Sequence, residues 1–191
     1  MTDESIDPRI CPWATSSPAM LAYHDQEWGV PSHDERYLFE ILTLEGAQAG
    51  LSWSTVLNKR VGYRAAFHDW DLQRMAAMTD PELDGLKLDP GIVRHAGKIA
   101  SVRTNAQATL RLHEAGTSLV DYAWNWVDGE RIVHHPRTLG ELATTTPLSD
   151  AISKDLKKRG FSFVGPTIVY SFLEAVGIVD DHVEGCPSKR G

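Results

Sequence analysis

The sequence predicts an all-α protein. Apolar residues recur at helical spacing along most of the chain, and capping residues, Pro and Gly punctuate these stretches. No stretch of useful length alternates apolar and polar residues as a strand does. The 191 residues have ordinary globular composition, with 42% hydrophobic and 24% charged residues. We expect one unit, 1–191, with a helical core over 32–177 and irregular terminal segments over 1–31 and 178–191.

The first expected helix of the core begins at a capping box. Ser32 and Glu35 have the required spacing and precede an apolar stripe. We expect this helix to run to about Glu45 and to stop near Gly46. Seven further helices are expected, because a capping residue, Pro or Gly precedes each apolar stripe. These helices begin near Ser52, Asp71, Thr79, Gly91, Ser118, Thr146 and Pro166.

The longest expected helix follows Asp89-Pro90-Gly91. Eight residues between Ile92 and Leu110 share one apolar stripe, and Gly116 closes the helix. The last helix ends near Gly177. The polar stretch 128–146 lies between two of the expected helices.

The composition excludes several classes of protein. No apolar run approaches the roughly 18 residues that a membrane-spanning helix needs. The first residues are acidic and lack the apolar segment of a secretory signal. Two cysteines in 191 residues do not make a disulfide framework. We therefore expect a cytoplasmic protein without membrane contact.

The charge distribution is uneven. The net charge of 19 − 26 = −7 argues against a non-specific coat for nucleic acid. Locally, however, Lys154, Lys157, Lys158 and Arg159 oppose only Asp155, which gives +3. This segment either neutralises phosphates or forms an ordinary solvated helix face.

Each terminal segment carries one cysteine and one candidate histidine ligand. Cys11 and His24 lie near one end, and His182 and Cys186 lie near the other. Two thiolates and two imidazoles form the closed tetrahedral set of structural zinc, which would clip the two segments together. A catalytic zinc is less favoured, because four protein ligands leave no position for water. The alternative is a pair of free thiols and surface histidines.

A short glycine-bracketed turn joins the last two expected helices. Lys157 and Lys158 precede Gly160, and Gly165 opens the following helix. The free N–H groups of a helix N-terminus attract phosphate, and the nearby lysines add positive charge. This arrangement is typical of a helix-hairpin-helix clamp on the DNA backbone. An ordinary corner between two helices remains the alternative.

Aromatic residues gather in the first 53 positions around one acidic residue. Trp13, Tyr23, Trp28 and Trp53 accompany Glu45, which ends an apolar helix. Aromatic faces and a carboxylate suit a cationic or electron-poor planar ring, because they supply stacking, cation–π attraction and hydrogen-bond acceptors. Alternatively, the aromatic side chains form core and Glu45 is solvated.

These residues belong to longer motifs, in which the chain resembles the 3-methyladenine DNA glycosylase I family. The motifs occur in order from residue 11 to residue 186, so that the resemblance covers nearly the whole chain. They are Cys11-Pro-Trp13, Tyr23-His-Asp-Gln-Glu-Trp-Gly-Val-Pro31, Leu44-Glu-Gly-Ala-Gln-Ala-Gly-Leu-Ser-Trp53, Gly91-Ile-Val-Arg-His-Ala-Gly-Lys98, Leu156-Lys-Lys-Arg-Gly-Phe-Ser-Phe-Val-Gly-Pro-Thr167 and Asp181-His-Val-Glu-Gly-Cys186.

The resemblance implies a helix-hairpin-helix glycosylase that excises 3-methyladenine from alkylated double-stranded DNA. Carried over residue by residue, Glu45 would hydrogen-bond the flipped base and Tyr23 and Trp53 would stack on it. Trp13 and Trp28 would line the pocket. One structural zinc would be held by Cys11, His24, His182 and Cys186.

The chain departs from the family at Met20, where similar members carry an aromatic residue. This change puts substrate affinity or range in doubt rather than the reaction. Leu51 is a candidate to fill the space that the flipped base leaves, or else a core leucine at a helix start.

We expect a monomeric enzyme that hydrolyses the N-glycosidic bond. Lys157, Lys158, Gly160 and Gly165 would bind DNA phosphates. One alternative is a DNA-binding module with a zinc clip and no catalysis, in which Glu45 has no role. Another is a zinc hydrolase for a small molecule, which needs an open metal position.

Overall fold

The structure, a computed structural model, describes residues 9–190. It is mainly helical, which confirms the predicted class. Its α-helices are α1 (Pro18–Gln26), α2 (Glu35–Gln48), α3 (Trp53–Leu57), α4 (Arg60–Ala66), α5 (Leu72–Ala76), α6 (Asp80–Leu86), α7 (Ala96–Glu114), α8 (Leu119–Trp124), α9 (Pro147–Lys158) and α10 (Pro166–Ala175). The shorter elements are 3-10 helices η1 (Pro12–Ser16), η2 (His68–Trp70), η3 (Asn125–Val127) and η4 (Leu139–Glu141), and strands β1 (Ile132–Val133) and β2 (Val179–Asp180).

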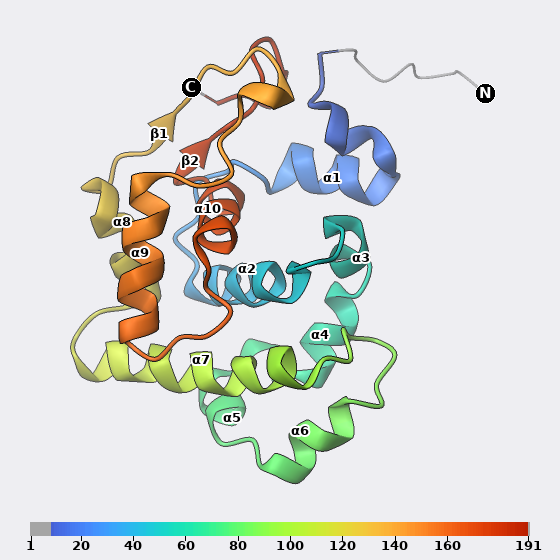
Figure 1. The fold of residues 1–191 in the computed structure, drawn as a ribbon, viewed down its shortest axis with the longest axis vertical. Coiled ribbons are helices and arrows are strands. Elements are labelled where there is room, and N and C mark those ends of the chain that lie inside the picture. The colour runs from blue at the N-terminus through green and yellow to red at the C-terminus, as the bar shows by residue number, and fades with distance from the viewer. Residues whose placement is uncertain (1–8, 191) are drawn as a thin grey trace.

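Helix α2 lies at the centre of the molecule. It is buried on all sides from Leu38 to Ala47, as a helix enclosed by its neighbours must be. Figure 1 shows α10 on one side of it and the long α7 on the other, and α2 contacts both. The C-terminal end of α2 therefore meets the turn into α3 and the face of α10.

Most of the predicted helix starts are confirmed. A side-chain oxygen at each of five predicted starts accepts a hydrogen bond from a backbone N–H in the first turn. These residues are Ser52, Asp71, Thr79, Ser118 and Thr146. Pro166 also occupies the first turn of α10, as expected.

The predicted start of α2 is wrong by two residues. Asp34, not Ser32, caps the helix and accepts hydrogen bonds from the N–H groups of Arg36 and Tyr37. Glu35 is the first helical residue, and its carboxylate instead accepts a hydrogen bond of 2.6 Å from the N–H of Leu119. Glu35 therefore caps α8, a helix that is distant along the chain. The local spacing of residues around Glu35 does not reveal such a cap.

The predicted end of α2 is also wrong, since the helix continues through Gly46 to Gln48. A Cβ added at Gly46 would lie 3.1 Å from the carbonyl oxygen of Phe163. The glycine therefore permits a close approach to the segment before α10 and does not end the helix. Helix α7 begins at Ala96, so that Ile92 and Val93 precede it.

The α-helices α1 and α4 were not predicted. The segment before Pro31 was expected to be irregular, and this prediction is wrong. This segment contains η1 and α1, whose start is marked by Ser17 as N-cap and Pro18 in the first turn. Residues 1–8 and 191 of the expected terminal segments lie outside the described residues.

The two ends of the described chain lie side by side. The N–H of Gly29 donates to the carbonyl of Glu174 at 3.0 Å, and Arg131 donates to the carbonyl of Gly29 at 2.9 Å. Strands β1 and β2 pair in parallel, with Ile132 opposite Val179. Over residues 9–190, no helix is both long enough and apolar enough to cross a bilayer.

Candidate functional site

A cavity of about 500 Å³ opens between α1, the end of α2, the start of α3 and one face of α10. It brings together every residue of the aromatic cluster that the sequence singled out, together with the acid. Its lining comprises Trp13, Ser16, Met20, Tyr23, Trp28, Glu45, Gln48, Ser52, Trp53, Ser54, Leu142, Ala143, Thr144, Thr167, Tyr170, Ser171 and Glu174.

Aromatic side chains form one continuous wall of this pocket. The rings of Tyr23 and Trp53 lie 5.1 Å apart between centroids, and those of Trp13 and Trp28 lie 5.0 Å apart. Trp13 also lies 6.4 Å from Tyr23 and so links the two pairs. Tilted and edge-on pairs at these distances are favourable, and they keep ring faces available for a planar ligand.

Glu45 lies inside the pocket and is only 5% exposed. Burial raises the pKa of its carboxyl to about 8. Burial raises the pKa of the neighbouring Tyr23 phenol. The negative charge of Glu45 is the second-largest cause of this shift. An enclosed acid with a raised pKa beside aromatic rings is typical of a functional site.

Two hydrogen-bond donors in the aromatic wall have no partner among the described residues. The hydroxyl of Tyr23 and the indole N–H of Trp53 are buried and bond to no other atom of the described chain. Buried polar groups are normally paired, so these donors suit a polar planar ligand. Met20, where we expect this chain to depart from the family, is buried and lines the same cavity.

The sequence interpretation missed the polar wall that α10 contributes. Thr167, Ser171 and Glu174 line the cavity and lie on one face of the helix, at spacings of four and three residues. They interrupt an otherwise apolar helix, and this stripe is the signal that identifies them.

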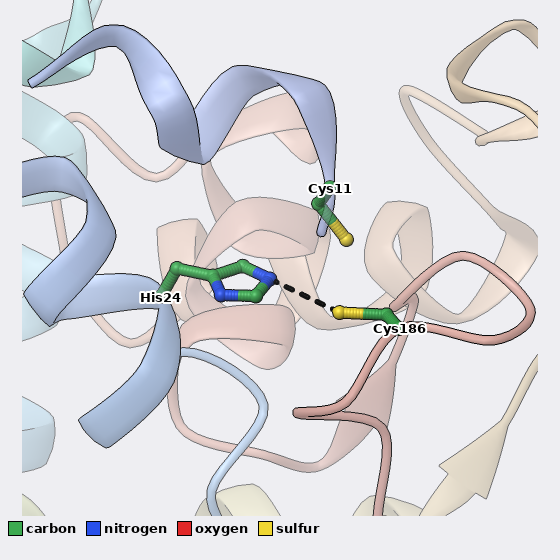
Figure 2. A group of neighbouring side chains, drawn as sticks. All are labelled: Cys11, His24 and Cys186. Carbon is green, nitrogen blue, oxygen red and sulfur yellow. Dashed lines mark hydrogen bonds between the residues drawn. The ribbon is translucent and has the colours of Figure 1, made fainter. Parts of the chain in front are cut away.

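Cys11, His24 and Cys186 form a second site next to the pocket, shown in Figure 2. One ligand atom from each lies within 4.8 Å of the others, and all three residues are buried. The Nε2 of His24 lies 3.5 Å from the Sγ of Cys186, and its Nδ1 lies 2.7 Å from Asp25. Burial lowers the pKa of His24 and so favours the neutral imidazole that binds metals.

His182 stands beside this group but outside it. Its ring lies 4.9 Å from that of His24, and its Nδ1 lies 2.7 Å from Oδ1 of Asp180. Its Nε2 is buried and has no partner in the described part of the chain. A carboxylate on one ring nitrogen and an unpaired second nitrogen is the usual arrangement of a metal-binding histidine.

The residues expected to contact DNA lie on the surface. Lys157 and Lys158 are exposed in the last turn of α9, and Gly160 is exposed in the turn that follows. Gly165 is the N-cap of α10. It has no side chain that could accept a hydrogen bond from the free N–H groups at the start of this helix. Leu51 is 40% exposed, so it is not a core residue.

Comparisons with known proteins identify the family of this chain. A family model for methyladenine glycosylase matches residues 13–189. The DNA-3-methyladenine glycosylase 1 of Escherichia coli (strain K12) is 51% identical over 176 residues, which cover 92% of this chain and 94% of that protein.

Two solved structures share the fold. A crystal structure of 3-methyladenine DNA glycosylase I has a TM-score of 0.93 and 49% identity, covering 95% of this chain and all of the other. A variant of 3-methyladenine DNA glycosylase I in complex with 3-methyladenine has a TM-score of 0.92 and 38% identity, covering 96% of this chain and 98% of that one. Because the family match and these similarities extend along almost the whole chain, the protein belongs to the methyladenine glycosylase family and is a glycosylase.

Proposed function

We propose that the protein hydrolyses the N-glycosidic bond of 3-methyladenine in alkylated duplex DNA. The observation that carries this proposal is the buried Glu45 carboxyl in one cavity with Tyr23 and Trp53. The relative from Escherichia coli is named for the same activity, and one structural neighbour binds 3-methyladenine.

The pocket residues bind the base after it has left the double helix. Flipping costs a few kcal/mol, and less for a damaged base. Tyr23 and Trp53 stack on the purine, while Trp13 and Trp28 close the pocket around it. N3-methylation makes the base cationic, and this charge favours the ionised form of Glu45 over its neutral form. Glu45 then accepts hydrogen bonds from the exocyclic amine of the base.

The reaction exploits a leaving group that is already activated. The bond between C1′ and N9 breaks, and its electron pair neutralises the cationic base, which leaves as 3-methyladenine. Water adds to C1′ of the oxocarbenium-like sugar and loses a proton to solvent. The aromatic faces stabilise the positive charge of the bound base before it leaves.

Residues outside the pocket hold the DNA. Leu51 enters the stack at the position of the flipped nucleotide, which its exposure on the turn after α2 supports. Lys157, Lys158, Gly160 and Gly165 bind phosphates at the end of α9 and the start of α10. The monomeric state and the cytoplasmic location stay predictions from the sequence.

Cys11, His24, His182 and Cys186 hold one structural zinc ion in this proposal. The donor set fits the ion: two buried thiols and His24 already converge, and the ring of His182, whose Nε2 has no partner among the described residues, lies 4.9 Å from that of His24. Bound zinc supplies stability to the two chain ends rather than a chemical step.

The test is incubation of the protein with methylated duplex DNA, followed by chromatography of the released bases and zinc analysis of the same sample. We expect free 3-methyladenine and one zinc ion per chain. Glu45→Gln should reduce the rate of release by roughly 5- to 150-fold, equivalent to ~1–3 kcal/mol in transition-state binding. DNA binding without any base release would instead support a non-catalytic DNA-binding module.

A further inference from the structure

The turn between α9 and α10 contains a backbone conformation that the proposed function leaves unexplained. Phe163 has a φ of +55°, in the left-handed region that residues other than glycine rarely adopt. Hydrogen bonds hold the chain on both sides of it. Asn105 bonds to the backbone of Ser162, and the hydroxyl of Ser153 donates to the carbonyl of the residue after Phe163 at 2.6 Å. Backbone strain that the surroundings enforce in this way occurs preferentially at functional sites.

Phe163 lies against α2 beside the acid of the pocket. A Cβ added at Gly46 would lie 3.2 Å from the Cβ of Phe163 and 3.1 Å from its carbonyl oxygen. The two segments are therefore so close that a side chain at Gly46 would displace one of them. Gly46 directly follows Glu45, which lines the cavity. A shift of the turn is thus transmitted to the part of α2 that holds the acid.

The ring of Phe163 also contacts the start of α7. A Cβ added at Gly97 would lie 3.3 Å from the Cζ of this ring, and the ring of His95, the N-cap of α7, lies 6.0 Å from it between centroids. The next residue of α7, Lys98, donates to two carbonyls at the end of α2, just before Leu51. Figure 1 shows the segment between α9 and α10 running between α7 and α2. One side chain therefore joins the elements that carry Gly160, Glu45 and Leu51.

We propose that Phe163 is a positioning residue, which fixes the phosphate-binding turn relative to Glu45 and Leu51. This inference rests on the proposed function and names the residue that aligns its separate contacts with DNA. The turn holds the DNA backbone, and the pocket holds the flipped base, so the spacing between them determines how C1′ lies relative to the pocket. A displacement of about 1 Å can reduce a rate by about 100-fold, even when it arises far from the reacting atoms.

Phe163→Leu tests this role, because it removes the ring carbon that faces Gly97. Fluorescence anisotropy with unmethylated duplex DNA measures binding by the turn. Quenching of tryptophan fluorescence by free 3-methyladenine measures binding by the pocket. Single-turnover release of the base from methylated duplex DNA measures their alignment. Both affinities should change by less than about twofold, whereas release should become about tenfold slower. A merely structural role would reduce stability or one of the affinities and would not slow release alone.

Phe67→Leu is the matched control. Phe67 is a buried phenylalanine that packs against Tyr63 and Trp70, and it does not line the cavity. Its replacement should lower stability and leave the rate of release and both affinities unchanged. The inference is overturned if Phe163→Leu releases the base at the wild-type rate, or if its release slows only as far as one of the affinities falls. It is also overturned if Phe67→Leu slows release to the same extent.

A second variant keeps the test open should Phe163→Leu not fold. Gly97→Ala adds a methyl group against the Phe163 ring and 3.2 Å from Cε1 of His95, and alanine suits a helix better than glycine. Gly85→Ala in α6 is its control, because nothing lies within 4 Å of the added Cβ. At equal affinities, Gly97→Ala should release the base several-fold more slowly than Gly85→Ala, and equal rates would overturn the inference.

Release by wild type separates this inference from the function on which it rests. If wild type releases no base from methylated DNA, the proposed function fails. If wild type releases the base and neither Phe163→Leu nor Gly97→Ala slows this release, only the role of Phe163 fails.

Discussion

Asn105 and Ser162 exchange two hydrogen bonds between side chain and backbone. The Nδ2 of Asn105 donates to the carbonyl of Ser162 at 3.1 Å, and the N–H of Ser162 donates to Oδ1 of Asn105 at 2.8 Å. Asn105 is buried in α7, whereas Ser162 lies in the turn between α9 and α10. The turn expected to hold DNA is thus fixed to the longest helix.

Asn105→Ala should loosen this turn. The substitution leaves the partly buried N–H and carbonyl of Ser162 without these partners, which lowers the free energy of unfolding by ~1–3 kcal/mol. Urea denaturation measures the loss, and fluorescence anisotropy should show weaker binding to methylated duplex DNA. Asn58→Ala, at an exposed position after α3, is the control. Unchanged DNA affinity in a destabilised Asn105→Ala protein would separate the turn from DNA binding.

Lys98 holds the turn that carries Leu51. Its Nζ donates to the carbonyls of Ala47 at 2.8 Å and Ala49 at 2.6 Å, and burial lowers its pKa. Lys98→Met should reduce base release from duplex DNA several-fold more than release from single-stranded DNA, because only a duplex requires the inserted leucine. Lys98→Arg should restore part of the loss. An equal reduction on both substrates would point to a general structural defect.

The helices could be predicted where the signals are local. Asp71 and Thr79 cap their own helices, so that a few residues contain the whole pattern. Helix α1 was missed because its buried residues Tyr23 and His24 serve the two sites and give no apolar stripe. Glu35 was misassigned because it caps α8, some eighty residues away along the chain.

The residues of the candidate site also divide into those that the sequence indicates and those that only the packing of the helices reveals. Residue type, closeness along the chain and the family-like motifs gathered Trp13, Tyr23 and Glu45, since aromatic rings and an acid suggest one kind of ligand. The contact of Lys98 with the turn after α2 could not be found in this way. It depends on the packing of α7 against α2, which the sequence pattern does not specify.

Because of Glu45, we expect the free energy of unfolding to decrease as the pH rises. Its pKa is about 8 in the folded protein and has the ordinary value of 4.5 when unfolded. Between these values unfolding releases a proton, so each pH unit removes about 1.4 kcal/mol from the free energy of unfolding. Glu45→Gln abolishes this contribution. Urea denaturation at several pH values should therefore show that the stability of the variant relative to wild type increases from pH 5 to pH 8. If the free energies of unfolding of the two proteins depend on pH in the same way, the burial of the acid is contradicted.

Lys157→Glu and Lys158→Glu should weaken DNA binding without changing base choice. Both side chains are exposed at the end of α9, where they would neutralise phosphates. Each reversal should lower the dependence of affinity on salt, because fewer counterions are released. The affinity for free 3-methyladenine should stay constant. Lys87→Glu, beside Asp84 at the end of α6, is the matched reversal and should have little effect.

Gly29 lies against the ring of His182, and its replacement tests the proposed zinc site. Its backbone has a φ of +73°, and an added Cβ would lie 2.6 Å from Cε1 of His182. Gly29→Ala should therefore lower stability through both backbone strain and displacement of the imidazole, by ~1–3 kcal/mol for the strain alone. Gly116→Ala is the control, since Gly116 has a φ of +80° but open space around it. If His182 is a zinc ligand, only Gly29→Ala should also reduce the zinc content measured by atomic absorption and increase zinc loss to a chelator. Equal zinc retention by the two variants would exclude His182 from the metal site.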